Sequence, residues 1–344
     1  MIPSNQAPVK RVPTSGKFRI GRALLTVNIL LFIGLKICYG TRPDACAAIT
    51  VFPAWIWLVP GLTLTALGYR RNGKRTFLIV VAVWLFFLLS ETEEPWSLLR
   101  AMPLRTTKSR GETLRVVTLN CAIGSPLAAA EVAAHRPDIV LLQESPNRAE
   151  VEELGRRLFG AKAGVVHGVD ASMVVRGRVI PAELPIAQRG YFVQAKVRFA
   201  SGREIEIIGA RLVPAVFRLD LWSPDCWREQ AENRRIRQKQ LRAIARRIET
   251  TSVPVIVGGD FNAPQGDAVF RLLEPKLHDA FREGGRGWGN TILNDYPVLR
   301  IDQIWVSKAF RSHAVVAVKT QNSDHRMVIC DLILEEEALT RKER

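Results

Sequence analysis

The sequence predicts an α/β domain preceded by a membrane-embedded N-terminal region. Apolar runs long enough to cross a bilayer, which takes about 20 residues each, are confined to residues 20–90. From Leu114 onward, short apolar runs rich in β-branched residues alternate with helical patterns, as expected of a layered α/β domain. The 344 residues are enough for one large domain or two ordinary ones.

Most of the positive charge lies in the apolar N-terminal region. The net charge of the chain is +16, and residues 1–75, with eleven Lys and Arg against Asp44 alone, contribute +10 of it. Basic residues that flank apolar runs set the orientation of membrane helices. The charge is therefore weak evidence for nucleic-acid binding.

The N-terminal 90 residues divide into a tail and three apolar runs. Residues 1–19 are polar and basic with three prolines, which predicts a disordered tail. Asn28 and Lys36 interrupt the first apolar run, and the third run is the shortest. The predicted transmembrane helices cover residues 20–40, 46–69 and 75–90.

The distribution of Lys and Arg predicts the orientation of these helices. The tail and the basic stretch 70–75 are expected in the cytoplasm, because cytoplasmic loops carry an excess of Lys and Arg. Three crossings then make this a multi-pass protein of the cell (inner) membrane with an extracytoplasmic α/β domain. The sidedness reverses if the third run does not cross. Residues 91–112, with two prolines and several charges, are expected to be a linker.

The α/β domain is predicted at residues 113–335, followed by a charged tail at 336–344. Its apolar runs predict strands at 114–120, 138–144, 171–175, 191–199, 204–210, 253–257, 301–306, 315–320 and 327–334. Helical periodicity predicts helices at 128–135, 150–159, 229–249 and 268–273. The helix at 229–249 is basic, and its arginines, among them Arg234 and Arg237, are interpreted as a solvated face, with contact to phosphates or anionic lipid as the alternative.

The domain is organised around the stretch Val255–Pro264. This short apolar run ends at Gly258 and Gly259, and Asp260 and Asn262 follow two positions apart. Residues i and i+2 of an extended segment point to the same side, so both side chains can face one substrate group. A carboxylate can take a proton or bind a hard cation, and a carboxamide can donate to a phosphate oxygen. An ordinary Asp/Asn turn after a strand is the alternative.

Several predicted strands, this one included, terminate in residues able to hold a cation or a phosphate. Strand ends are where α/β proteins place functional sites, so these residues are candidates for one shared site. They are Asn120, Glu144, Asp260, Asp302 and the pair Asp324-His325.

The order of these motifs resembles a known family. The motifs are Thr118-Leu119-Asn120, Gln143-Glu144-Ser145, Gly259-Asp260-Phe261-Asn262, Arg300-Ile301-Asp302-Gln303-Ile304 and Ser323-Asp324-His325. Taken together they resemble the endonuclease/exonuclease/phosphatase (DNase I-like) superfamily, here as a membrane-anchored, bacterial-type member. The resemblance covers residues 113–335. It implies a four-layered α/β/β/α sandwich and hydrolysis of phosphoester bonds with a divalent metal.

The resemblance also implies the metal site. Glu144 matches the metal-binding glutamate of the family, Asn120 the asparagine that positions metal and phosphate, and Asp324 the acid beside the metal centre. The implied cofactor is Mg²⁺ or Mn²⁺, and carboxylate oxygens are suitable ligands for such hard cations.

The catalytic roles implied by the resemblance fall on four residues. Asp260 matches the acid that activates the attacking water, and Asn262 matches the amide that orients the phosphate. His325 matches the histidine that binds the scissile phosphate or assists proton transfer, and Asp302 orients it. A carboxylate bonded to an imidazole raises the imidazole pKa and fixes its tautomer. Asn290 lies in a glycine-containing loop that fits the family's substrate loop.

Arg211 departs from the family pattern. Many members carry a histidine at the matching position after a central strand, whereas this chain has Ile208-Gly209-Ala210-Arg211-Leu212. An arginine cannot donate a proton near neutral pH, but it can bind a phosphate through two hydrogen bonds. Arg211 is therefore expected to bind substrate, and its presence leaves the substrate class open.

Two classes of function follow. The first is a membrane-anchored metal-dependent phosphoesterase whose substrate is a nucleic acid, a phospholipid headgroup or a related phosphodiester or phosphomonoester. The second is a catalytically weakened or inactive member of the family that acts as an anion- or lipid-binding module. No obligate protein partner is inferred from the sequence.

Overall fold

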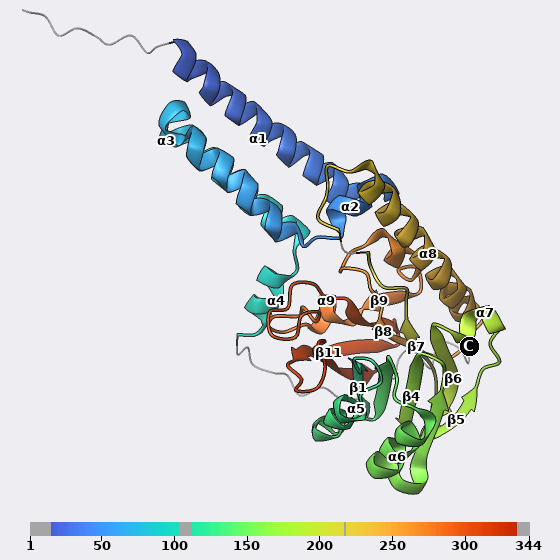
Figure 1. The fold of residues 1–344 in the computed structure, drawn as a ribbon. Coiled ribbons are helices and arrows are strands. Elements are labelled where there is room, and N and C mark those ends of the chain that lie inside the picture. The colour runs from blue at the N-terminus through green and yellow to red at the C-terminus, as the bar shows by residue number, and fades with distance from the viewer. Residues whose placement is uncertain (1–14, 103–111, 217, 336–344) are drawn as a thin grey trace, which may run out of the picture. The chain divides into compact units, whose positions relative to one another are not determined.

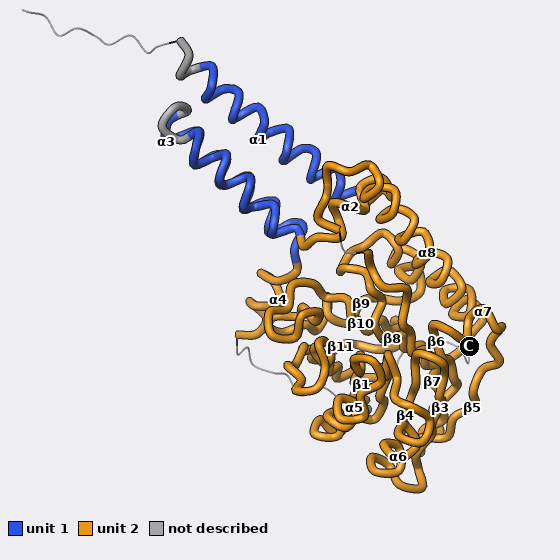
Figure 2. Tube along the Cα trace, in the orientation of Figure 1, with its two compact units in different colours: residues 1–41, 54–92 blue, residues 42–53, 93–344 orange. Residues whose placement is uncertain are grey.

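The computed structural model describes residues 15–102, 112–216 and 218–335 of the chain (Figure 1). These residues form two compact units (Figure 2). The chain up to Thr41 and residues 54–92 form a helical unit, and residues 42–53 join residues 93–335 in a larger unit. The predicted tail at 336–344, the first fourteen residues of the predicted N-terminal tail and residues 103–111 of the predicted linker lie outside the described residues.

The larger unit contains two six-stranded sheets. In spatial order, the strands of the first sheet are β11 (Phe310–Val318), β12 (Met327–Leu334), β1 (Glu112–Asn120), β2 (Ile139–Gln143), β4 (Ala171–Arg176) and β3 (Ala163–His167). Those of the second sheet are β5 (Arg178–Pro181), β6 (Phe192–Arg198), β7 (Glu204–Arg211), β8 (Val255–Asp260), β10 (Asp302–Ser307) and β9 (Leu277–Asp279). In each sheet a central pair, β1 with β2 and β7 with β8, is parallel.

Helices cover the outer faces of the two sheets. A core cluster that includes Leu141, Met173 and Ile207 lies between the sheets. A second cluster packs the outer face of the second sheet against α8, and a third packs the outer face of the first sheet against α5 and α6. The helical elements of this unit are η1 (Asp44–Cys46), α2 (Ala47–Thr50), α4 (Glu94–Arg100), α5 (Pro126–Glu131), η3 (Val132–His135), α6 (Arg148–Phe159), η4 (Gly160–Lys162), α7 (Ile186–Arg189), α8 (Pro224–Glu249), η5 (Ala268–Leu272) and α9 (Ala280–Gly284). The layers therefore run α/β/β/α, as the family resemblance implies.

The predicted strands are all present, whereas several short elements were not predicted. β3, β5 and β9 have three to five residues each, too few for a clear alternation of apolar and polar residues. The predicted helix at 268–273 is a 3₁₀-helix. In α8 the side chains of Arg234 and Arg237 are buried rather than solvated, which corrects the interpretation of a wholly solvated basic face.

The helical unit contains α1 (Ser15–Thr41), η2 (Ala54–Trp57) and α3 (Leu58–Glu91), and α3 is broken at Gly73. By length and composition, Arg19–Thr41 and Gly73–Glu91 are apolar enough to cross a membrane. The predicted second span at 46–69 is not continuous, because Asp44–Thr50 and Ala54–Gly68 meet at a bend of 76°. α1 begins at Ser15, so the last residues of the predicted disordered tail are helical.

The polar residues that interrupt the first apolar run are hydrogen-bonded within the helical unit. Asn28 Nδ2 donates to Gly61 O at 2.9 Å and to Thr65 Oγ1 at 2.8 Å, and Asn28 Oδ1 accepts from Trp84 Nε1 at 2.8 Å. Lys36 pairs with Glu91. Polar groups buried among apolar helices need such partners, so Asn28 holds α1 against both parts of α3.

The segment 42–53, expected as a membrane loop and the start of a span, instead folds with the larger unit. Arg234 on α8 donates to Pro43 O at 3.1 Å and to Thr50 Oγ1, and it pairs with Asp267 at 3.1 Å. Arg42 donates to Gln265 O at 3.2 Å. This segment therefore packs against the turn that follows Asn262.

The first part of the expected linker also belongs to the larger unit. Arg300, two residues before Asp302, pairs with Glu93 at 2.5 Å and with Asp279 at 2.6 Å. Burial opposes the charge of Glu93, but Arg300 and Arg282 lower its pKa below the ordinary value. Residues 93–102 are thus a structural part of the domain, and the domain begins well before residue 113.

The buried ion pair between Arg234 and Asp267 generates a stability prediction. Both side chains are 1% exposed, so Arg234→Ala leaves a buried carboxylate without its cation and should lower the free energy of unfolding by about 3–5 kcal/mol. Arg235→Ala is the matched control: this side chain is 56% exposed, and its loss should change the free energy of unfolding by less than about 1 kcal/mol. Urea unfolding of the full chain in micelles, followed by tryptophan fluorescence, measures both. Equal effects would contradict the assignment.

Candidate active site

Strand register brings the predicted polar residues to one edge of the two sheets. In the second sheet Asp260 is paired with both Arg211 and Asp302, and in the first sheet Asn120 is paired with Gln143, the residue before Glu144. Two parallel strands end at the same edge of a sheet, and an antiparallel neighbour begins at that edge. The residues that follow β1, β2, β7 and β8 therefore lie near the start of β10 and near the residues before β12.

The close approach of β7 and β8 depends on a glycine near the end of β8. Gly259 has φ +146°, and a Cβ there would lie 1.9 Å from Ala210 O on β7. A side chain cannot fit this approach, so β7 and β8 can come together only with glycine at this position. Asn262 follows with φ +49°, and its backbone N–H donates to Asp260 Oδ1 at 2.9 Å.

Asp302 and His325 form a buried ion pair that joins the two sheets. His325 Nδ1 donates to Asp302 Oδ2 at 2.8 Å. The backbone N–H of His325 donates to Ser323 Oγ, which in turn donates to Asn120 O, so the histidine loop is tied to the end of β1. Burial disfavours the imidazolium, but the Asp302 carboxylate outweighs it and raises the pKa of His325 to about 10.

Asp260 lies at the centre of the site. Burial and the charge of Asp302 raise the pKa of Asp260 to about 7. A carboxyl group with a pKa near neutrality is suited to accept a proton from water. Its Oδ2 accepts from Asn120 Nδ2 and from Asn262 Nδ2, both at 3.1 Å.

The two asparagines position carboxylates. Asn262 Nδ2 also donates to Leu212 O at 2.9 Å, so both of its amide hydrogens are engaged by the protein. Asn120 Nδ2 also donates to Glu144 Oε1 at 3.1 Å, so Asn120 connects Glu144 with Asp260. The Asn262 amide therefore holds Asp260.

Glu144 adopts a left-handed backbone conformation, with φ +44°. Such conformations are uncommon for residues other than glycine and often mark functional sites. Glu144 Oε2 accepts from the backbone N–H of Ile123 at 2.6 Å. Burial opposes ionisation, but the hydrogen bonds from Ile123 and Asn120 and the charge of Arg211 lower the pKa of Glu144 below its ordinary value.

Arg211 forms an ion pair with Glu144. Its two terminal nitrogens lie 2.7 Å from Glu144 Oε1 and 2.7 Å from Asp170 Oδ2. The guanidinium of Arg211 thus lies beside the carboxylate that, by the family resemblance, would bind the metal.

Two predicted residues lie outside this network. Asp324 is exposed, and no hydrogen bond among the described residues joins its carboxylate to Glu144 or Asn120, although its charge helps to raise the pKa of His325. Asn290 is buried, and its amide donates to Glu94 Oε1 at 3.0 Å rather than to the residues around Asp260.

The donor set fits a hard divalent cation. Asp302 Oδ1 is buried and has no hydrogen-bond partner, which is a costly arrangement unless a cation or water satisfies it. One potential ligand atom each from Asp260, Asp302 and His325 lies within 4.8 Å of the others. Because the His325 imidazole is protonated and engaged by Asp302, the carboxylates and the Asn120 carboxamide are the better ligands.

This arrangement defines the class of the protein. Two facing sheets with helices outside, and carboxylates, amides and an imidazolium gathered at one edge, form the site of a phosphoester hydrolase. Residues 117–325, more than half of the chain, match the profile of the Endonuclease/Exonuclease/phosphatase family, and the chain belongs to this family. Members of the family typically depend on a divalent metal. No match was found among curated proteins.

Solved structures share the fold. An endonuclease/exonuclease/phosphatase family protein from Bacteroides thetaiotaomicron is 14% identical with a TM-score of 0.51, and the alignment covers 66% of this chain and 100% of that one. A functionally unknown conserved protein from Enterococcus faecalis V583 is 13% identical with a TM-score of 0.50, covering 64% and 100%. At these identities the similarity shows the fold and says nothing about substrate.

Asp170 and Ile123 belong to the site but were not among the predicted residues. Asp170 precedes β4, which is antiparallel to β2, so the start of β4 lies at the same edge as the end of β2. A polar residue just before an antiparallel strand can therefore indicate a site residue once the strand pairing is known. Ile123 contributes a backbone N–H, which no side-chain motif reveals.

The charges around Asp302 generate a prediction about pH. In wild type, hydrolysis should rise as Asp260 loses its proton near pH 7 and persist until His325 loses its proton near pH 10. Asp302→Asn removes a negative charge that raises both pKa values, so both limbs of the rate profile should move to lower pH. Initial rates between pH 5 and 11 measure this. An unchanged alkaline limb would show that Asp302 does not hold the His325 proton.

Proposed function

We propose that this protein is a membrane-anchored, metal-dependent phosphoesterase that hydrolyses a phosphodiester or phosphomonoester by in-line attack of water. The observation that carries the proposal is the buried cluster of Asp260, Asp302 and His325, with Glu144 connected to it through Asn120. Family membership supports the same reaction class.

The residues of the cluster have complementary tasks. Asp260, unprotonated above about pH 7, accepts the proton of the attacking water. The His325 imidazolium, whose Nδ1 is engaged by Asp302, offers Nε2–H to a phosphoryl oxygen and stabilises the developing negative charge. Asn120 and Asn262 keep the Asp260 carboxylate in position. A bound Mg²⁺ or Mn²⁺, held by Glu144 and Asn120, would polarise the phosphoryl group.

The chain connections support an extracytoplasmic α/β domain. The chain passes from the helical unit to the larger unit after Thr41, returns at Ala54 and leaves again after Thr92. Residues 42–53 and 93–335 fold together. The chain must therefore pass all three of these points on the same side of a bilayer. An even number of crossings therefore separates Ala54 from Thr92, in agreement with the helix break at Gly73.

The predicted side of the α/β domain therefore no longer depends on whether the third apolar run crosses the membrane. The helical residues 54–69, which precede the basic stretch, extend about 24 Å, somewhat less than the hydrocarbon core, so this crossing requires a locally thinner bilayer. Together with α1 they make three crossings, so the N-terminus and the basic stretch 70–75 lie on the side opposite the α/β domain. The excess of Lys and Arg places that opposite side in the cytoplasm of the cell membrane.

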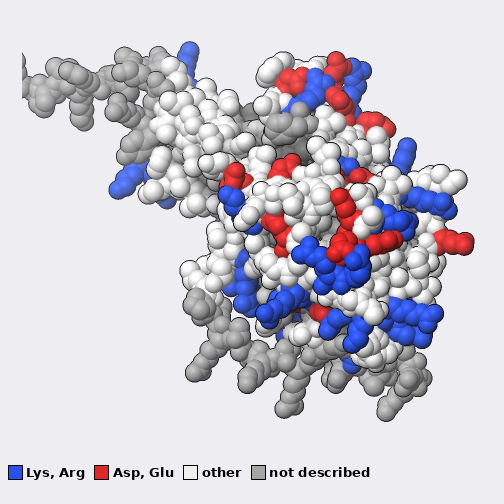
Figure 3. Space-filling model, turned by 60° about the horizontal axis from the view of Figure 1, so that its bottom comes forward, with Lys and Arg blue, Asp and Glu red and all other residues white. Residues whose placement is uncertain are grey.

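The substrate is a phosphoester at the membrane surface or a nucleic acid. Among the residues that the structure describes, basic and acidic side chains are interspersed over the face shown in Figure 3, and they form no continuous basic track across it. Nucleic-acid binding relies on such basic tracks, so this distribution favours a lipid headgroup over a long polyanion.

The ion pair between Arg211 and Glu144 favours a second candidate function. An arginine that permanently neutralises the metal-binding carboxylate would leave an anion- or lipid-binding module without catalysis. The intact cluster around Asp260 supports the enzyme instead.

The test of the proposed function is hydrolysis by the full chain in micelles. Wild type should hydrolyse bis-p-nitrophenyl phosphate with Mg²⁺ or Mn²⁺ and stop in EDTA, and Asp260→Asn or His325→Ala should lower the rate by about 10²–10⁴. Asp295→Asn, an exposed aspartate paired with Lys319, is the matched control and should retain full activity. Folded wild-type protein that binds Mn²⁺ but hydrolyses neither this substrate nor phospholipid would establish the binding module.

The sidedness has its own test in two full-length fusions. Alkaline phosphatase, which is active only after export, should be active when attached after Arg344, because the C-terminal domain follows three crossings. Green fluorescent protein at the same position should be dark, because it fluoresces only in the cytoplasm. The opposite pair of results would place the domain in the cytoplasm.

A further inference from the structure

The short helix α4 has its polar residues inside and its apolar residues outside. Glu94 and Ser97 are buried, whereas Trp96, Leu98, Leu99 and the following Met102 are exposed. A surface helix of a soluble domain shows the opposite pattern, with an apolar stripe toward the core. The outward face of α4 is therefore a candidate contact surface.

Hydrogen bonds fix α4 in this orientation. Glu94 Oε1 accepts from Asn290 Nδ2 at 3.0 Å, and Ser97 O accepts from the backbone N–H of Gly287 at 2.9 Å. Arg100 Nε donates to Gly285 O at 2.8 Å. The helix cannot turn its apolar residues inward without breaking these bonds to the loop at 285–290.

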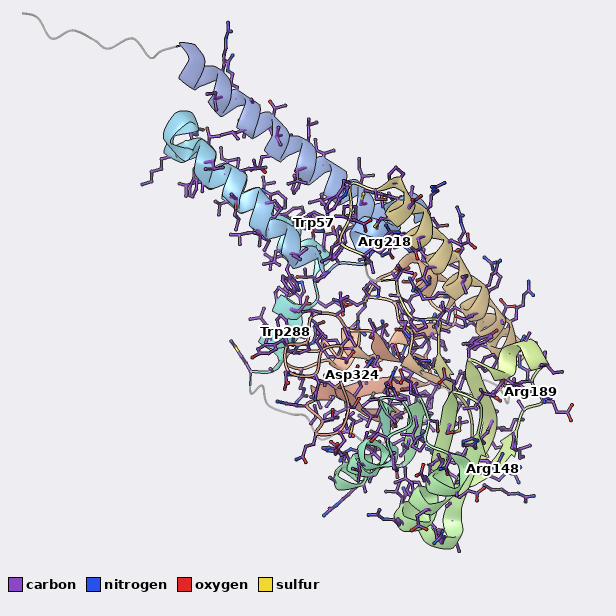
Figure 4. All side chains as sticks on the ribbon, viewed as in Figure 1. Trp57, Arg148, Arg189, Arg218, Trp288 and Asp324 are labelled. Carbon is purple, nitrogen blue, oxygen red and sulfur yellow. The ribbon has the colours of Figure 1, made fainter. Side chains whose placement is uncertain are left out.

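The same loop continues to the active site. Ile292 forms a β-bridge with His325, and the backbone N–H of Asn294 donates to Asp324 O at 2.8 Å. Three side chains of this loop, Trp288, Leu293 and Tyr296, are exposed. Trp288 lies beside α4 in Figure 4, and the loop leads from there to Asp324.

These exposed apolar residues form what we call the collar. It comprises Trp96, Leu98, Leu99, Met102, Trp288, Leu293 and Tyr296. Exposed apolar residues concentrated on one short helix and on the loop bonded to it are candidates for an interaction site, unlike single scattered ones. The collar is rich in Trp and Tyr, the residues that accumulate at membrane–water interfaces.

The chain itself indicates what covers the collar. The apolar helix Gly73–Glu91 is long enough to cross a membrane, and α4 begins three residues after its end. Three residues reach at most about 11 Å, so Glu94 is never far from the point where the chain leaves the hydrocarbon. Helices at this depth place their apolar face into the boundary between headgroups and acyl chains.

We propose that the collar lies in the interfacial layer of the lipid bilayer and that the adjoining active site acts on phosphoesters of membrane lipids. The placement of the collar rests on the proposed membrane attachment, and the choice of substrate rests on the proposed hydrolase function. The collar holds the 285–299 loop, and with it His325, at the level of the lipid headgroups. The substrate phosphate then reaches the site without leaving the membrane.

The first test is photo-crosslinking of the full chain in vesicles of phosphatidylethanolamine and phosphatidylglycerol. A benzophenone amino acid in place of Leu99 should form lipid adducts. The same amino acid in place of Ile186, which is 84% exposed on α7, should form none. Equal lipid labelling at both positions, or protein dimers instead of lipid adducts at position 99, would overturn the proposal. This readout does not depend on catalysis.

The second test compares two substrates. The double variant Leu99→Asp/Met102→Asp should hydrolyse phospholipid in the same vesicles roughly tenfold more slowly or worse, because it loses apolar burial at the interface. Its rate on bis-p-nitrophenyl phosphate should equal that of wild type, and Ile186→Asp should leave both rates unchanged. Equal losses on both substrates, or no loss on phospholipid, would overturn the proposal. A wild type inactive on both substrates would overturn the hydrolase function, while lipid adducts at position 99 would still support the placement of the collar.

Discussion

The ion pair between Asp302 and His325 is the interaction on which the active site depends. Asp302 begins β10 of the second sheet, and His325 lies just before β12 of the first sheet. The 2.8 Å contact therefore requires both sheets to end at one edge in a fixed register. It also keeps a positive charge beside Asp260 and Asp302, two buried carboxylates that would otherwise repel each other without compensation.

The segments that adjoin the apolar helices are built into the larger unit. Residues 42–53 are held by Arg234 against the turn after Asn262, and Glu93 is paired with Arg300, two residues before Asp302. Each of these contacts lies within a few residues of the catalytic cluster. These segments thus support the two loops that carry Asn262 and Asp302, and a fragment that starts after residue 102 would lack both supports.

Arg211 adds a fixed positive charge to the site. It is held by Asp170 and faces Glu144, and an arginine keeps its charge at every physiological pH. The groups of the site that can change their charge between pH 5 and 11 are therefore Asp260 and His325.

The sequence alone determined the α/β class of the domain, the positions of nine of the twelve strands among the described residues and the polar residues at their ends. These features are local, because alternation, β-branched residues and glycines act within a few positions of the chain. Through its motifs it also pointed to Asp260, Asp302, His325, Glu144 and Asn120, which the structure brings together.

Only the tertiary structure decided which distant groups meet. The pairing of Arg211 with Asp170, the burial of Arg234, the inclusion of residues 42–53 in the domain and the inverted face of α4 all depend on strand order and packing. The residues next to a side chain in the sequence do not indicate which distant group it contacts after folding. For that reason the sequence predicts a solvated side chain for Arg234 and a linker for residues 93–102.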